Sequence, residues 1–266
     1  MSTITIAIST LNDGFNRIDI EKIRTICDRY DFSLLIIHQI SNDFNYDYSK
    51  VELIDFCDVI VTKDKGLSKS RNIALNSCKT EFLLLSDDDV DYLGNSLDVI
   101  VKGDYLQGKY VSCFKACIKS DHSKDFKAYS KSSKKLNTLD CAKVSSIEMI
   151  VNMKLWRKSP VYFDEQFGLG TSNPSGEEFI FLTDIKKQGE AVFFQPSTIV
   201  AHDEFSSGQD FYSSDELCRA KVNMFNRVYS SKSFFYIFAF FIKKFTVLLR
   251  NRACFRFLSQ WYKSLL

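Results

Sequence analysis

Three adjacent aspartates, Asp87, Asp88 and Asp89, follow the apolar run "EFLLLS" at residues 81–86. Neighbouring carboxylates repel each other, and a buried charge is unfavourable unless it is paired or bound to a metal. Because side chains alternate along a strand, Asp87 and Asp89 are expected to point to the same side. Two carboxylates on one side can face a hard divalent cation such as Mg²⁺ or Mn²⁺. A solvated turn would explain the triplet equally well.

A second acidic pair, Glu177 and Glu178, occurs in "GEEFIFL" at a predicted helix start, where the helix dipole favours negative charge. Glu178 falls on the apolar stripe of Phe181, Leu182 and Ile185, so it is expected to be held near the sheet. Burial raises a carboxyl pKa and a helix N-terminus lowers it, which would leave an ionised but basic group suited to proton removal. The alternative is helix capping, the role expected mainly of Glu177.

His202, in "STIVAHDEFSSG", follows a predicted strand and is one of only three histidines. A neutral imidazole there could bind a metal, and a protonated one could contact phosphate. A lone histidine is more often structural, so this residue alone decides nothing.

The elements that must position these groups alternate between strand and helix in the first half of the chain. Short apolar runs predict strands, and apolar residues at helical spacing predict helices. The strands are expected at 3–9, 32–38, 58–62 and 81–86, and the helices at 17–30 and 66–78, with Ser68 as N-cap. Such alternation predicts an α/β fold with a mostly parallel central sheet and helices on both faces. Ligands bind outside the carboxyl ends of such strands, where the aspartates lie.

The second half is less regular. Strands are expected at 110–118 and 191–196, a strand and turn at 145–160, a loop at 120–135 and a helix at 177–187. The eight cysteines lack zinc-type pairs and are expected to be buried, reduced thiols of a cytosolic protein. The first residues lack the basic region of a signal peptide. A cytoplasmic location is therefore expected.

The charges divide the chain into an acidic body and a basic tail. Residues 217–266 contain ten Lys or Arg and no Asp or Glu, which leaves 25 basic against 33 acidic residues before that point. The apolar stretch at 234–242 is nine residues long, too short to span a bilayer. A helix of this composition can lie in the interface of an anionic membrane, or it can pack on the rest of the protein.

Taken in order, five segments resemble the family 2 glycosyltransferases of the GT-A fold. They are "ISTLN" at 8–12, "GLSKSRNIAL" at 66–75, "LLLSDDDV" at 83–90, "GEEFIFLTDIKKQG" at 176–189 and "AHDEFSSG" at 201–208. The resemblance covers about residues 3–208. It implies a catalytic domain at 1–208, with a donor-binding half at about 1–92 and an acceptor half at 93–208. A C-terminal helical extension at 209–266 would follow.

The resemblance also implies roles for individual residues. Glu178 is the expected catalytic base, and Glu177, its neighbour in the same motif, is the second candidate catalytic residue. The metal, Mn²⁺ or Mg²⁺, would be held by Asp89 with Asp87 and His202. The donor, a UDP-sugar, would contact Thr10, Asn12, Gln39, Arg71, Asn72, Asp87 and Asp88.

The sequence departs from the family pattern at several positions. The family often has aspartates after the second strand, one of which reads the uracil. Here the segment is "IIHQIS", so His38 or Gln39 must serve, and Gln39 offers both a donor and an acceptor. Ser9 replaces the usual proline, and Glu178 stands where aspartate is commoner. Lys69 could touch the diphosphate or be surface charge, and Trp156 could stack on a sugar or lie in the core.

The resemblance implies an inverting transfer to a glycan or lipid-linked glycan, in surface-polysaccharide synthesis. The enzyme would be peripheral on the inner face of the cytoplasmic membrane and would have no nucleic-acid partner. A retaining transferase and a non-catalytic nucleotide- or carbohydrate-binding module remain alternatives. A sugar-phosphate nucleotidyltransferase is disfavoured, because that class needs a glycine-rich loop after the first strand, where only Gly14 occurs.

Overall fold

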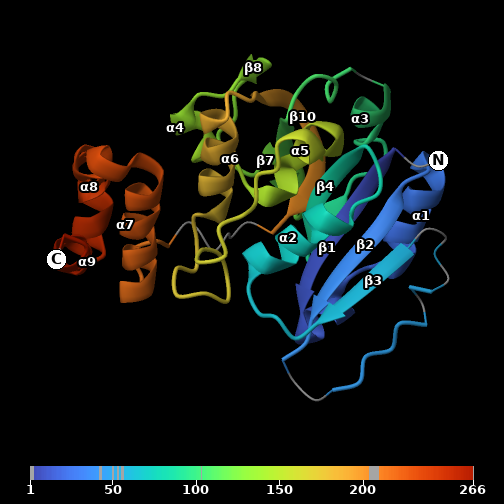
Figure 1. The fold of residues 1–266 in the computed structure, drawn as a ribbon, viewed down its shortest axis with the longest axis horizontal. Coiled ribbons are helices and arrows are strands. Elements are labelled where there is room, and N and C mark those ends of the chain that lie inside the picture. The colour runs from blue at the N-terminus through green and yellow to red at the C-terminus, as the bar shows by residue number, and fades with distance from the viewer. Residues whose placement is uncertain are drawn as a thin grey trace.

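A mixed β-sheet forms the centre of the protein (Figure 1). The computed structural model describes residues 3–41, 44–49, 51–52, 54, 57–102, 104–203 and 210–265. Within these residues the sheet has ten strands, in the order β3-β2-β1-β4-β9-β6-β10-β5, with β7 on β6 and β8 on β10. The strands are β1 (Ile4–Leu11), β2 (Ser33–Gln39), β3 (Cys57–Thr62), β4 (Phe82–Asp87), β5 (Asp91–Tyr92), β6 (Val111–Ile118), β7 (Asp121–Asp125), β8 (Lys134–Lys135), β9 (Met149–Asn152) and β10 (Val192–His202).

The first four strands in space, β3, β2, β1 and β4, run parallel. Strand β9 is antiparallel to both β4 and β6, and β10 runs parallel to β6. The carboxyl ends of β1, β2 and β4 therefore lie at one edge of the sheet, where a ligand site is expected.

Helices cover both faces because the strands are apolar on both sides. In β1, Ile6 and Ile8 join the core cluster that includes α1, whereas Ala7 joins the cluster of α2 and α6. The helices of this part are α1 (Ile20–Tyr30), α2 (Leu67–Ser77), α3 (Asp98–Lys102), α4 (Thr138–Cys141), α5 (Met153–Lys158) and α6 (Glu177–Lys187), with 3₁₀ turns η1 (Asn12–Arg17) and η2 (Ser146–Glu148). The expected α/β class is confirmed.

Several local expectations need correction. Helix α2 begins at Leu67 after Gly66, and Ser68 donates instead to the Phe167 carbonyl oxygen at 2.6 Å. The expected loop at 120–135 contains β7 and β8, because both find partners on the sheet. The expected turn after β9 is helix α5, which Asn152 caps. Helix α6 has the predicted bounds.

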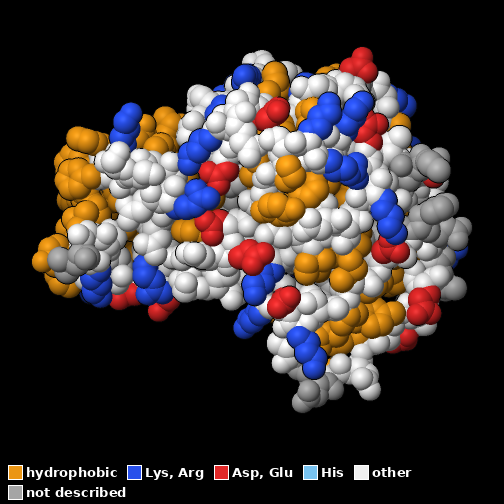
Figure 2. Space-filling model, in the orientation of Figure 1, with side chains coloured by type: hydrophobic (Ala, Val, Ile, Leu, Met, Phe, Trp, Pro, Cys, Tyr) orange, Lys and Arg blue, Asp and Glu red, His pale blue; other side chains and the backbone are white. Residues whose placement is uncertain are grey.

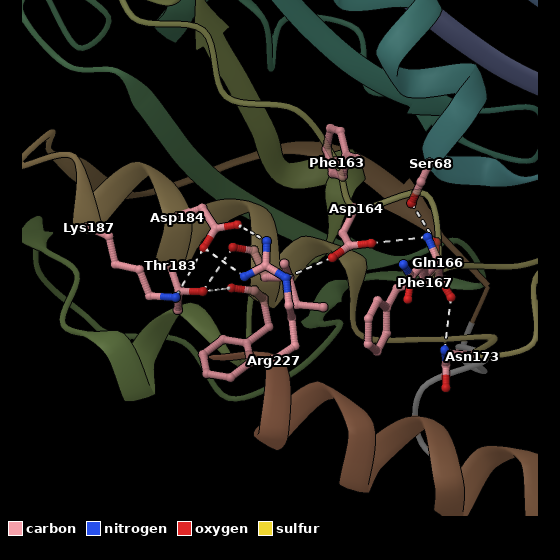
Figure 3. A network of polar contacts seen from close by, with 12 residues as sticks. Ser68, Phe163, Asp164, Gln166, Phe167, Asn173, Thr183, Asp184, Lys187 and Arg227 are labelled. Atoms are coloured by element: carbon pink, nitrogen blue, oxygen red, sulfur yellow. Dashed lines mark hydrogen bonds and ion pairs between the residues drawn. The ribbon is translucent and has the colours of Figure 1, made fainter. Parts of the chain in front are cut away.

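Three further helices form a cluster beside α6: α7 (Asp215–Tyr229), α8 (Ser233–Arg250) and α9 (Cys254–Lys263), with the turn η3 (Ser230–Lys232) before α8 (Figure 1). They share a core around Val222, Leu248 and Phe257. Arg227 of α7 joins this cluster to the body, since it pairs with Asp164 at 2.8 Å and with Asp184 of α6 at 2.7 Å (Figure 3). None of the described helices is long and apolar enough to cross a membrane.

All eight cysteines are free thiols. Six are buried and two, Cys57 and Cys254, are half-buried. Burial raises the pKa of Cys27 and of Cys57 to about 12, so these thiols stay protonated near neutral pH.

Candidate active site

The three aspartates lie at the carboxyl end of β4, but each faces a different partner. Asp88 turns toward the end of β1, where the Thr10 hydroxyl donates to it at 2.6 Å and Arg17 pairs with it at 2.6 Å. Gly14 allows this approach, because a Cβ there would lie 2.2 Å from Asp88 Oδ2. Asp88 and Thr10, both predicted to contact the nucleotide, thus bind each other and hold η1 against the strand end.

Asp89 faces His202, which stands at the end of β10. Asp89 Oδ1 is buried and lies 3.5 Å from His202 Nε2, with no hydrogen bond of good geometry among the described residues. The contact lowers the pKa of Asp89 and raises the pKa of His202. His202 Nδ1 lies 2.8 Å from the Asp203 carbonyl oxygen, which can only accept. Nδ1 therefore carries a proton. The protonated ring directs Nε2–H toward Asp89, and only the neutral ring offers a lone pair at Nε2 that a cation could take.

This pair was predicted to bind a metal together with Asp87. Within the described residues, no group of three or more His, Cys, Asp or Glu side chains is arranged to hold a metal ion. Asp87 is directed to Arg71 instead. A carboxylate and an imidazole with the right tautomer nevertheless fit a cation that takes its other ligands from phosphate and water, as Mg²⁺ commonly does.

Arg71 of α2 connects the strand end with the start of α6. Its Nη1 lies 3.2 Å from Glu177 and 3.3 Å from Glu178, and its Nη2 lies 3.5 Å from Asp87 and 2.6 Å from Ser146 Oγ. The side chain is only 2% exposed. These contacts assign Arg71 to positioning three carboxylates, and its predicted contact with a nucleotide stays untested.

Glu177 is the buried glutamate of the pair and Glu178 the more exposed one, the reverse of what the sequence predicts. Glu177 is 4% exposed, and its Oε2 has no hydrogen-bond partner among the described residues. Burial, and next the nearby Glu178 carboxylate, raise the pKa of Glu177 to about 7, against the opposing effect of Arg71. The Glu178 side chain is 22% exposed. Glu177 stands three and four residues before Ile180 and Phe181, which are fully buried, so it shares their inward face of α6.

The predicted uracil readers lie together at the end of β2. His38 is fully buried, with Nδ1 2.8 Å from the Tyr48 hydroxyl and Nε2 3.0 Å from the Asn12 carbonyl oxygen, and its ring stacks on Phe15. Gln39 donates to the Gly66 carbonyl oxygen at 2.9 Å. Both ring nitrogens of His38 are thus bonded within the protein. Gln39 is therefore the better placed of the two residues to contact a uracil.

The remaining predicted residues have mainly structural contacts. Asn12 has a left-handed backbone, with φ 48°, and its side-chain oxygen accepts a hydrogen bond from the Ser41 backbone N–H. This bond fixes the chain after β2. Asn72 exchanges two hydrogen bonds with the backbone of Phe163. Trp156 is buried and donates to the Val161 carbonyl oxygen, which makes it a core residue and corrects the alternative of an acceptor platform. Lys69 is half-buried at the start of α2.

Four residues of this site escaped the sequence analysis. Gly14 leaves room for Asp88, Arg17 pairs with Asp88, and Ser146 accepts from Arg71. Burial lowers the pKa of Lys221 of α7, and the carboxylates of Glu178 and Glu177 oppose that effect. The glycine at the end of an apolar strand was the one usable signal, since glycine often marks a close approach of the backbone to another group.

Replacing Arg71 with methionine is expected to destabilise the protein by about 3–5 kcal/mol at pH 8, because three carboxylates lose their cation in a largely buried place. The loss should shrink toward pH 5. Glu177, whose folded pKa is already about 7, would take up a proton as the pH falls below that value. Chemical denaturation at both pH values measures the difference. Loss of stability that is equal at pH 5 and pH 8 would contradict the charge explanation and indicate a packing defect.

Comparison with solved structures places this fold among the glycosyltransferases. The S. aureus protein TarS (residues 1–349) is 16% identical, with 99% of this chain and 72% of that chain covered and a TM-score of 0.53. TarS 1–349 in complex with UDP-GlcNAc is 16% identical over 86% of this chain and 68% of that one, with a TM-score of 0.54. The mannosyltransferase PcManGT from Pyrobaculum calidifontis, in complex with GDP-Man and Mn²⁺, is 15% identical over 85% and 63%, with a TM-score of 0.57.

A scan against protein-family models finds no match, and a search of curated proteins finds none either. At these identities the likeness establishes the fold alone. The chain therefore has a glycosyltransferase fold of the GT-A type, with additional C-terminal helices.

Proposed function

We propose that this protein is an inverting glycosyltransferase, similar to family 2, that moves a sugar from a UDP-sugar to a glycan or lipid-linked glycan. The observation that carries the proposal is that Arg71 brings the start of α6 to the carboxyl end of β4, and so joins two groups of charged residues. Asp89 and His202 form one group, and Glu178 at the start of α6 forms the other. Arg71 and Asp87 connect them. The complexes of TarS with UDP-GlcNAc and of PcManGT with GDP-Man and Mn²⁺ support this class of donor.

Glycosyl transfer requires stabilisation of a leaving diphosphate and removal of a proton from the acceptor hydroxyl. A divalent cation on Asp89 and His202 would act as a Lewis acid toward the diphosphate. Glu178, partly exposed and held by Arg71, would accept the acceptor proton. A base on the face opposite the leaving group leads to inversion at the anomeric carbon, so an α-linked donor would give a β-linked product.

The remaining assignments follow the same division. Residues 1–92 would bind the donor, with Gln39 near the base and Thr10, Asn12, Asn72 and Asp88 shaping the pocket that receives it. Residues 93–208 would bind the acceptor, and residues 209–266 would form an extension.

The proposal is tested with purified full-length protein and a panel of UDP-sugars. We expect Mn²⁺- or Mg²⁺-dependent release of UDP for at least one donor, and a β-anomeric product by NMR with an acceptor. An α-anomeric product would favour a retaining transferase. Donor binding without turnover on any acceptor tested would favour a binding module.

We further propose that the C-terminal helices contact an anionic membrane, such as the inner face of the cytoplasmic membrane. Helix α8 turns a row of apolar side chains outward at spacings of three and four residues, and α9 does the same, as the orange surface over these helices in Figure 2 indicates. The exposed residues that form these rows are Phe235, Phe238, Ile242, Phe245 and Leu249 on α8, and Phe255, Leu258, Tyr262 and Leu265 on or after α9. Phe235 is 71% exposed and Phe255 is 85% exposed.

Charge distinguishes a membrane from a second copy as the occupant. Helices α8 and α9 carry five cationic and no anionic side chains, so two such helix pairs would repel each other, whereas anionic headgroups would attract them. The sequence is compatible with two arrangements of the C-terminal segment, contact with a membrane or packing on the rest of the protein. The structure has α7 packed on α6 while the outer faces of α8 and α9 stay uncovered by described residues.

The double variant Phe235→Ser/Phe255→Ser is expected to bind vesicles of anionic lipid at least about tenfold more weakly than the intact protein, because it removes two large apolar groups from the interface. Cosedimentation measures this, and added salt should release the intact protein. The control Leu139→Ser changes an exposed leucine on the body. Equal binding to anionic and neutral vesicles, or none to either, would contradict the proposal. Ending the chain near Ser231 is a poorer test, since it would uncover Val222 of α7.

A further inference from the structure

The turn η2 supplies the shortest polar contact of Arg71 among the described residues. Arg71 Nη2 donates to Ser146 Oγ at 2.6 Å, whereas its contacts with the three carboxylates are between 3.2 and 3.5 Å long. Ser146 is buried. The guanidinium is planar and its donors have fixed directions, so its best acceptor determines how it is oriented. The place of Arg71 among the carboxylates therefore depends on where η2 holds Ser146.

Glu148, the last residue of η2, is a buried carboxylate with contacts on both oxygens. It is 1% exposed. Its Oε1 accepts from the Tyr129 hydroxyl at 2.5 Å and pairs with Lys127 Nζ at 2.9 Å. Its Oε2 accepts from the backbone N–H of Ser145, the N-cap of the turn, at 3.1 Å. Lys127 Nζ also donates to Ser145 Oγ at 2.8 Å, so one lysine holds both ends of η2.

Tyr129 ties this network to the central sheet. Its hydroxyl accepts from the Ala116 backbone N–H of β6 at 3.1 Å. Its ring stacks on Phe194 of β10, with the ring centroids 5.9 Å apart. Lys127 Nζ lies 5.7 Å from the centroid of the Tyr129 ring, a distance at which a cation is attracted to the aromatic face. Strands β6 and β10 are thus linked through η2 to Arg71.

The ion pair of Glu148 is more than the turn itself needs. The capping box of η2 uses only Glu148 Oε2, whereas Lys127 and Tyr129 contact Oε1. Desolvation offsets much of the attraction within a buried ion pair, so apolar side chains of similar volume would often be as stable. A fully bonded polar network instead fixes a single arrangement of its groups. The contacts of Oε1 are therefore suited to holding η2 in one orientation.

We propose that Glu148 is a positioning residue for sugar transfer, which fixes η2 so that Ser146 orients Arg71 beside Glu178. This inference rests on the proposed function for the role of Glu178. Glu148 acts through Ser146 and Arg71 and not on the substrate. Loss of its charge is expected to slow the transfer step and to leave the affinity for the donor unchanged.

The position of Arg71 can be measured without any transfer reaction. In full-length protein labelled with ¹⁵N at arginine, the Arg71 Nε–H resonance is assigned with the variant Arg71→Lys. We expect Ser146→Ala and Glu148→Gln to shift or broaden this resonance, and Tyr129→Phe, which removes one oxygen only, to do so to a smaller extent. A resonance that responds to Ser146→Ala but to neither of the other two variants would overturn the link through η2, whether or not the protein transfers a sugar.

Kinetics give the second readout, measured as release of UDP from the UDP-sugar that the protein turns over. Glu148→Gln is expected to lower kcat about tenfold to a hundredfold with the donor KM unchanged, as misplacement of a catalytic group does. Because Glu148 and Ser146 both act on Arg71, the double variant Ser146→Ala/Glu148→Gln should be about as slow as the slower single variant. Lys127→Arg should retain most of the rate that Lys127→Met loses. Rate losses that multiply in the double variant would overturn the proposal.

Asp140→Asn is the matched control. Asp140 closes the capping box of α4 and pairs with Lys134 at 3.0 Å, as Glu148 does with its own lysine in η2. The segment before α4 contacts the last turn of α6, where Lys186 donates to the Leu136 carbonyl oxygen at 2.6 Å. Asp140→Asn should therefore be destabilised and keep its kcat. An equal loss of kcat in this variant would attribute the effect to a weakened fold and overturn the positioning role. If no UDP-sugar is turned over, the proposed function fails, and the resonance measurement still decides the link through η2.

Discussion

Replacing Glu178 with glutamine is expected to slow glycosyl transfer by about 10²–10⁴-fold, the usual effect of removing a positioned base. Glutamine keeps the size of the side chain and can still accept from Arg71, which lies 3.3 Å from Glu178 Oε1, but it cannot take up the acceptor proton. Donor binding should therefore be retained. Initial rates with saturating donor, and UDP-sugar affinity by calorimetry, separate the two effects.

Glu177→Gln is the matched control for this prediction. Glu177 is the more buried of the two residues, with a pKa of about 7, so it carries a proton at lower pH and loses it as the pH rises through that value. Ionisation of Glu177 adds negative charge beside Glu178, which favours transfer of the acceptor proton to the protein. We expect the intact enzyme to gain rate through pH 7, and Glu177→Gln to lose that increase with a smaller drop in maximal rate. A larger loss in Glu177→Gln than in Glu178→Gln would move the base assignment to Glu177.

Replacing Asp89 with alanine is expected to abolish metal-dependent turnover and to leave the fold intact. Asp89 Oδ1 is a buried oxygen without a well-formed hydrogen bond, and it is next to two other aspartates. Its removal relieves repulsion from the neighbouring aspartates but also loses the contact with His202 that lowers the pKa of Asp89, so the protein without metal should lose little stability. Turnover at increasing Mn²⁺ and thermal unfolding without metal test the two parts of this prediction.

Asp91→Ala serves as the control, because Asp91 is close in sequence but forms its ion pairs among the described residues with Lys22 and Lys119, at 3.5 and 3.7 Å, and not with His202. It should keep its metal response. Full activity in the Asp89 variant would reject the assigned metal site, and a large loss of thermal stability would show that Asp89 is a structural residue instead.

Local patterns in the sequence were sufficient for the main elements. Strands β1 to β4 and helix α6 follow from apolar runs and from helical spacing, which depend on neighbours a few residues away. The place of Asp87–Asp89 at the carboxyl end of a strand follows in the same way. At 120–135 the sequence predicts a loop, whereas the structure has the strands β7 and β8. These segments are strands only because they pair with β6 and β10, and no local pattern indicates that pairing.

The partners of the charged residues were decided by the tertiary structure. Helical spacing suggested that Glu178 would be the inner glutamate, but Glu177 is the buried one, on the same face of α6 as the fully buried Ile180 and Phe181. Likewise the resemblance predicts that Arg71 contacts the nucleotide, whereas in the structure its guanidinium contacts three carboxylates from β4 and α6. Composition alone indicated a basic, apolar tail. Which of its phenylalanines pack on α7 and which face outward depends on how α8 and α9 cross it, because burial is a property of the assembled helices and not of the residues themselves.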